Sequence, residues 1–133
     1  MTYDAVVIDD ERLAIDGMKR FDWESHGFQL VGTFQDPMKA LEWLKVNSAH
    51  LIMADIRMPQ MSGLELAKVI HDILPDVLVI LFSGHSEFSY AQKAIRYGVV
   101  RYVLKPVDDD EFAAALEDVG RLLDEREKRK HWT

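Results

Sequence analysis

Five short apolar segments recur along the chain, separated by segments with helical spacing. Four of them stay apolar over nearly every residue: 5–8 (AVVI), 50–54 (HLIMA), 77–82 (VLVILF) and 99–104 (VVRYVL). Such runs are typical of strands buried on both faces, as in a parallel sheet. In the fifth segment, 28–34 (FQLVGTF), apolar and polar residues alternate more. The pattern predicts five strands.

Helix start signals precede several of the intervening segments. Asp36 followed by Pro37 has the form of an N-cap and a first helical residue, and Ser62 with Glu65 has the form of a capping box. Apolar residues then recur at helical spacing. They are Ala40, Leu41 and Leu44; Leu66, Val69, Ile70 and Ile73; Phe88, Ala91 and Ile95 after Ser86; and Phe112, Leu116, Val119 and Leu123 after the acidic run 108–110.

Strand and helix alternate from about residue 3 to about residue 127, without an internal linker or repeat. This order favours an α/β fold with an open, mostly parallel sheet and helices on both faces. We expect one domain over residues 1–127. The stretch 124–130 (DEREKRK) loses the apolar stripe, and is either a solvated helix end or a helical linker. Residues 128–133 would then be a tail or the start of that linker.

Composition narrows the class of protein. Of 133 residues, 48% are hydrophobic and 29% charged, and the net charge is −7, as expected for a folded domain without a nucleic-acid surface of its own. The chain has no cysteine, which excludes disulfides, thiolate zinc sites and thiol nucleophiles. No apolar run approaches the roughly 20 residues that span a bilayer. We therefore expect a soluble cytoplasmic protein.

Polar residues stand where four of the predicted strands end. Asp9 and Asp10 follow the first strand, Asp55 the third, Ser83 the fourth and Lys105 the fifth. The carboxyl ends of parallel strands meet at one edge of the sheet, so these side chains are expected to converge. Taken singly, each has a simpler explanation, such as a helix cap, a strand end or a loop.

Together these residue types suit phosphoryl transfer. Two or three carboxylates form a hard oxygen site for Mg²⁺, and a carboxylate is a competent nucleophile toward phosphorus. The developing charge then needs a cation and a hydroxyl around the phosphoryl oxygens. The sequence predicts Asp55 as nucleophile, Lys105 as counter-charge and Ser83 as the hydroxyl.

The motifs "VVIDDE", "LIMADIRMPQMSGLEL", "VILFSGHSEF" and "YVLKPVD" resemble those of the receiver domain of two-component response regulators, over about residues 3–125. The stretch "SGHSEFSYAQKAIRYGVVRYVLKPV" is most similar to receivers that precede an AraC-type helix-turn-helix output domain. The resemblance implies a flavodoxin-like five-stranded sheet in the order 2-1-3-4-5, and a cis Lys105–Pro106 bond.

The resemblance also implies a metal site. Asp55 would be the phospho-acceptor, and Asp10 and Asp55 would bind Mg²⁺, or Mn²⁺, directly. The backbone carbonyl of Arg57 would complete the direct ligands, and Asp9 would act through a water molecule.

Two further residues would form the switch of such a receiver. Ser83 would bond a phosphoryl oxygen after phosphorylation, and Tyr102 would turn inward as the Ser83 loop closes. The expected partners are a histidine kinase and a second copy, bound through the fourth helix, fifth strand and fifth helix. DNA would be contacted only through another domain, and the chain would be a signalling domain rather than a turnover enzyme.

Three other classes of protein are alternatives to a receiver domain, and each requires different residues at the ends of the strands. An aspartate-nucleophile phosphatase carries its nucleophile after the first strand with a second aspartate two residues later, whereas Asp9 and Asp10 are adjacent. A flavodoxin-type FMN carrier needs a hydroxyl- and glycine-rich phosphate loop there, and carboxylates would repel the phosphate. A phosphorylation-independent dimerisation module would have no use for the acidic residues, Ser83 and Lys105.

Overall fold

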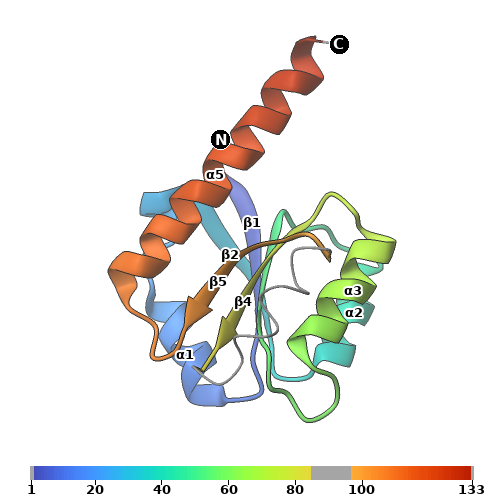
Figure 1. Cartoon of the computed structure of the whole chain (residues 1–133), viewed down its shortest axis with the longest axis vertical. Helices are drawn as coiled ribbons and strands as arrows, with labels where there is room; N and C mark the ends of the chain where they lie inside the picture. Colours follow the sequence, from blue (N-terminus) through green and yellow to red (C-terminus); the bar gives the residue numbers. More distant parts are fainter. Residues whose placement is uncertain (1, 85–96, 133) are drawn as a thin grey trace.

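The computed structural model describes residues 2–84 and 97–132, the side chains as far as residue 130. Its five strands form one parallel sheet in the order β2-β1-β3-β4-β5, which confirms the predicted topology (Figure 1). The strands are β1 (Tyr3–Ile8), β2 (Phe28–Phe34), β3 (Leu51–Asp55), β4 (Leu78–Ser83) and β5 (Val99–Leu104). Each lies within a residue or two of its predicted segment.

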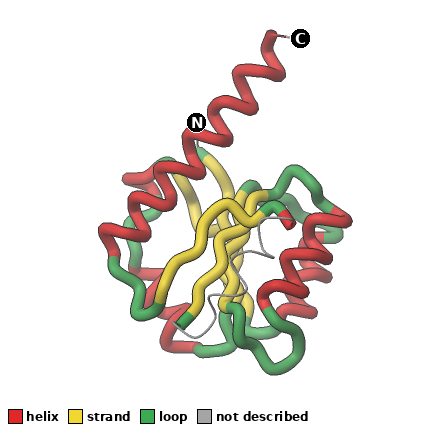
Figure 2. The backbone as a smooth tube through the Cα atoms, in the orientation of Figure 1, coloured by secondary structure: helices red, strands yellow, loops and turns green. Residues whose placement is uncertain are grey.

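Helices cover both faces of the sheet, as Figures 1 and 2 show. One face carries α1 (Arg12–Arg20) and α5 (Asp109–Trp132), and the other carries α2 (Pro37–Leu44) and α3 (Gly63–Ile73). A short 3-10 helix, η1 (Glu24–His26), was not predicted. The helix predicted around residues 86–95 lies outside the described residues.

The predicted helix starts are confirmed at α2 and α3. The Asp36 carboxylate accepts a hydrogen bond from the Met38 N–H at 2.9 Å, with Pro37 as the first helical residue. The Ser62 hydroxyl oxygen accepts one from the Glu65 N–H at 3.1 Å. Each cap satisfies a backbone donor that the helix itself leaves unpaired.

The continuous apolar runs are explained by two cores, one on each side of the sheet. Along β1, Val7 belongs to the core under α1 and α5, whereas Val6 belongs to the core under α2 and α3. Met53 and Ile52 divide in the same way on β3. Because successive side chains of a strand point to opposite faces, a strand with a core on both sides is apolar at every position.

The last helix is longer than its apolar stripe. Among the side chains described, which end at residue 130, Leu123 is the last one of α5 in the core, but the helix continues to Trp132 (Figure 1). No helical break marks residue 127, and the division at that point stays a prediction. Within residues 2–84 and 97–132, no helix combines the length and the apolar character needed to cross a membrane.

Candidate functional site

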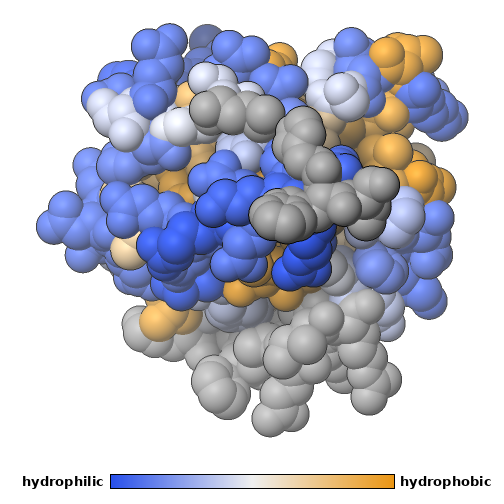
Figure 3. All heavy atoms as spheres, turned by 90° about the horizontal axis from the view of Figure 1, so that it is seen from above, coloured by the Kyte–Doolittle hydropathy of each residue, from blue (hydrophilic) through white to orange (hydrophobic). Residues whose placement is uncertain are grey.

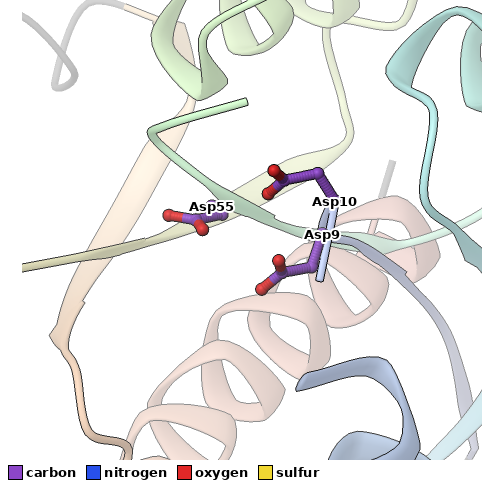
Figure 4. Close-up of side chains that lie close together, drawn as sticks. All are labelled: Asp9, Asp10 and Asp55. Atoms are coloured by element: carbon purple, nitrogen blue, oxygen red, sulfur yellow. The ribbon is translucent and has the colours of Figure 1, made fainter. Parts of the chain in front are cut away.

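Three carboxylates meet at the carboxyl edge of the sheet. Asp9 and Asp10 follow β1 directly, and Asp55 is the last residue of β3. One carboxylate oxygen from each lies within 4.8 Å of the others, and Figure 4 shows the three groups projecting toward the same side. The predicted convergence of these residues is confirmed. We call Asp9, Asp10 and Asp55 the acidic cluster.

Lys105 joins two members of the acidic cluster. It follows β5, and its Nζ donates to Asp55 Oδ2 at 2.9 Å and to Asp9 Oδ2 at 3.1 Å. Both carboxylates are largely shielded from solvent, with side-chain exposures of 10% for Asp55 and 4% for Asp9. The Lys105–Pro106 peptide bond is cis, as expected. The Lys105 ammonium compensates part of the negative charge of Asp55 and Asp9.

Burial and the neighbouring charges shift two pKa values in the site. Burial raises the pKa of Asp9, although the Glu11 N–H and the Lys105 ammonium act in the opposite direction. Burial alone would lower the pKa of Lys105, but the hydrogen bonds and charges of Asp55 and Asp9 outweigh it, so this pKa is raised. The surroundings of Lys105 therefore favour its charged form, whereas burial of Asp9 disfavours its charged form.

Backbone contacts fix the position of Asp55. The Arg57 N–H donates to Asp55 Oδ1 at 3.3 Å, and the Ile56 N–H donates to the Phe82 carbonyl at 3.0 Å. Gly63, the first residue of α3, donates its N–H to the Ile56 carbonyl at 2.8 Å. A Cβ at Gly63 would lie 2.5 Å from the Asp55 carbonyl oxygen. Only a glycine lets α3 approach the end of β3 this closely.

Sequence reasoning missed two supporting residues. Gly63 is one of them, because nothing in the apolar pattern reveals how closely α3 approaches Asp55. Gln35, just beyond β2, donates its side-chain N–H to the Asp10 carbonyl oxygen at 3.3 Å. A single exposed glutamine carries no sequence signal for that contact.

Two further predicted site residues lie on the neighbouring strands β4 and β5. Ser83 ends β4 next to β5, and its hydroxyl donates to the Gly84 carbonyl at 2.7 Å. Tyr102 on β5 is half-buried and packs against the core under α2 and α3. The structure therefore brings Asp9, Asp10, Asp55 and Lys105 into one cluster, with Ser83 on the adjacent strand. The roles predicted for these residues remain predictions.

The donor set of the acidic cluster suits a hard divalent cation. Three carboxylates and one ammonium leave a net negative charge, and carboxylate oxygens are the ligands that Mg²⁺ prefers.

Comparison with known proteins identifies the family. Residues 5–117 match the model of the response regulator receiver domain. The transcriptional regulatory protein YesN of Bacillus subtilis is 37% identical over 132 residues, which are 98% of this chain and 36% of YesN. The transcriptional regulatory protein HptR of Staphylococcus aureus is 33% identical over 129 residues, 96% of this chain and 50% of HptR. The chain therefore spans between a third and a half of the length of these relatives.

Solved structures agree with this assignment. The receiver domain of AraT, a response regulator from Geobacillus stearothermophilus, has a TM-score of 0.87 and 32% identity, covering 96% of this chain and 99% of its own. A two-component transcriptional regulator AraC from Clostridium phytofermentans has a TM-score of 0.82 and 31% identity, covering 90% of this chain and 94% of its own. By its motifs, its parallel sheet and these matches, the chain belongs to the response regulator receiver family.

Proposed function

We propose that this chain is a phosphorylation-controlled signalling switch whose phospho-acceptor is Asp55. The observation that carries the proposal is the bridge from Lys105 Nζ to Asp55 and Asp9 within the acidic cluster. This bridge holds the Asp55 carboxylate, the proposed nucleophile, beside the Lys105 ammonium at the carboxyl edge of the parallel sheet. The transcriptional relatives support a place in gene regulation.

The acidic cluster would hold Mg²⁺, with Mn²⁺ as a substitute. Asp10, Asp55 and the backbone carbonyl of Arg57 would be the direct ligands, and Asp9 would act through water. Receiver domains bind Mg²⁺ at an acidic pocket, and the three carboxylates here match that donor set. When bound, the cation neutralises charge that builds up on the transferred phosphoryl group.

The chain's own residues would carry the transfer. An oxygen of Asp55 attacks the phosphorus of a phosphohistidine on a histidine kinase. The new O–P bond forms as the N–P bond breaks, and the departing imidazole nitrogen keeps the electron pair. Lys105 would then exchange its contact with the carboxylates for one with a phosphoryl oxygen, where its positive charge offsets the charge of the transferred group.

The switch would follow from the added charge. The Ser83 hydroxyl, which donates to the Gly84 carbonyl in this structure, would donate to a phosphoryl oxygen instead. Tyr102 would turn inward as the segment after β4 closes. A phosphoryl group that binds one conformation better shifts the population toward it.

The decisive experiment is phosphorylation by a small donor. With Mg²⁺ and acetyl phosphate, intact mass analysis should show one phosphoryl adduct on the parent chain. Asp55→Asn should show none, and EDTA should suppress the adduct on the parent. An adduct that persists in Asp55→Asn would refute the acceptor assignment. A parent chain without any adduct would favour the phosphorylation-independent dimerisation module.

The surface proposed for output is the face of the fourth helix, β5 and α5, through which two phosphorylated copies would pair. In the described part of this face, Arg101 on β5 forms an ion pair with Asp118 on α5 at 2.6 Å. Light scattering before and after phosphorylation tests the pairing, and Asp55→Asn is the matched control. A parent whose mass does not change on phosphorylation would exclude dimerisation as the output.

The remaining proposals concern the whole protein. Residues 1–127 would form the receiver, and residues 128–133 a tail or the start of a linker. DNA would be contacted only through an output domain of the AraC type, in the cytoplasm. The family match favours this reading over a phosphatase, because receiver domains of response regulators are signalling domains.

A further inference from the structure

The distal segment of α5, residues 124–132, extends beyond the apolar stripe that packs this helix on the domain. The whole helix has 24 residues, but residues 124–130 include no apolar side chain and lie beyond the core. Figure 3, which views the molecule from the end where α5 projects, shows a mostly hydrophilic surface there. The first part of α5 nucleates the helix, but residues 124–130 have no apolar face that packs on the domain, so the end of the helix can fray or bend unless polar contacts hold it.

Tyr3 provides the first contact. Its hydroxyl donates to Asp124 Oδ1 at 2.5 Å, which joins the start of β1 to the distal segment. The tyrosine is buried, and its ring packs on Phe28 and His50 with centroid distances of 6.0 and 5.1 Å. The donor therefore sits on a side chain that the core already fixes.

Arg126 provides the second contact. Its Nη1 donates to the carbonyl oxygen of Asp76, between α3 and β4, at 2.6 Å. A hollow of about 290 Å³ lies among Tyr3, His50, Asp76 and the distal segment. Because the distal segment borders this hollow and has no side chain in the apolar core among residues 124–130, directional bonds contribute to its position.

We propose that Tyr3 and Arg126 clamp the distal segment in one direction relative to the sheet and make it a rigid strut. The two contacts attach it to different parts of the domain, at β1 and at the turn before β4, so together they oppose pivoting as well as fraying. Ion pairs within the segment, Glu125 with Arg129 at 4.0 Å and Glu127 with Lys130 at 3.6 Å, add helical support. The clamp lies at the amino ends of the strands, away from the acidic cluster, and does not rest on the proposed function.

Amide hydrogen exchange tests the clamp on the chain as it is, without metal or phosphate. Tyr3→Phe keeps the ring and removes only the hydroxyl, and Arg126→Gln removes the second contact. Each should speed the exchange of amides 125–130 by about three- to tenfold, as expected for the loss of one such hydrogen bond. Amides in the first part of α5, residues 112–119, should keep their parent rates.

The matched control is Glu125→Gln, which breaks the ion pair with Arg129 in the same segment but neither clamp contact. It should change the same amides by about twofold or less. Parent exchange rates in both clamp variants would overturn the proposal. So would an equal acceleration of residues 112–119, because Tyr3 and Arg126 would then stabilise the whole domain rather than the strut.

Spin-label distances test the direction of the strut separately. The chain has no cysteine, so labels on Asp72→Cys in α3 and Lys128→Cys in α5 report one distance. Both positions are exposed. The parent should give a narrow distribution, and Tyr3→Phe with Arg126→Gln a clearly broader one. An equally broad parent distribution would show that no strut exists.

Discussion

Gly63→Ala should destabilise the protein although it adds a good helix former to a helix. An ideal Cβ at this position lies 2.5 Å from the Asp55 carbonyl oxygen, half an ångström inside the 3.0 Å limit below which real Cβ contacts are essentially absent. It also lies 2.9 Å from Ile56 Cα. Both neighbours are backbone atoms at the end of β3, so no flexible side chain can move aside.

The magnitude follows from two opposing effects. Forcing a methyl group into a packed contact costs about 1–3 kcal/mol. Replacing glycine by alanine in a helix returns up to about 1 kcal/mol, and less at a first helical residue. The net loss of about 1–2 kcal/mol should lower the melting temperature by roughly 3–8 °C. Thermal unfolding followed by far-UV circular dichroism measures it.

Gly17→Ala is the matched control, because this glycine lies inside α1. A Cβ there meets no heavy atom of the described residues within 4 Å, so the variant should gain up to about 1 kcal/mol of stability. A Gly63→Ala protein as stable as Gly17→Ala would refute the reasoning. It would show that α3 moves away from Asp55 at no cost.

Three further predictions concern ionisable groups and the metal. At ten times its dissociation constant, Mg²⁺ should stabilise the parent by about 1.4 kcal/mol in thermal unfolding, and Asp10→Asn should lose most of this gain. The pKa of Asp9 is raised in the folded state. The stability of the protein in EDTA should therefore increase as pH falls from 7 through that pKa toward the ordinary carboxyl value. The urea midpoint of Asp9→Asn should rise less than that of the parent over the same pH change. Burial and then Asp124 raise the pKa of Tyr3 to about 12. The contribution of Tyr3 to stability is therefore complete below pH 10 and is lost as pH rises toward 12. The stability of Tyr3→Phe should fall less steeply than that of the parent over this range. A variant with the same pH slope as the parent would contradict the corresponding assignment.

Much of the fold was predictable because local patterns report burial. Consecutive apolar residues identified strands with a core on both faces, and Asp36 and Ser62 identified two helix starts. The first helix was harder to place, because Glu11 at its start forms no side-chain cap and only Ile15 of the helix is buried. A weak cap and a thin apolar face leave little local signal.

The candidate site was predictable as a set of residues but not as an arrangement. That Asp9, Asp10, Asp55, Ser83 and Lys105 stand at strand ends follows from the sequence, since parallel strands end at a common edge. Their pairing does not follow from it. That Lys105 contacts both Asp55 and Asp9, and that the Ser83 hydroxyl turns to Gly84, depends on distances that no local pattern encodes.

The sequence by itself determined the layers, the strand order expected for its family and the residues gathered at the carboxyl edge. Only the tertiary structure decided what holds them in place. Gly63 touches the backbone of Asp55, and Tyr3 reaches Asp124 across 121 positions of sequence. Local patterns record burial and helix propensity, because these act over a few neighbouring residues. Contacts between distant segments exist only after the sheet has brought those segments together.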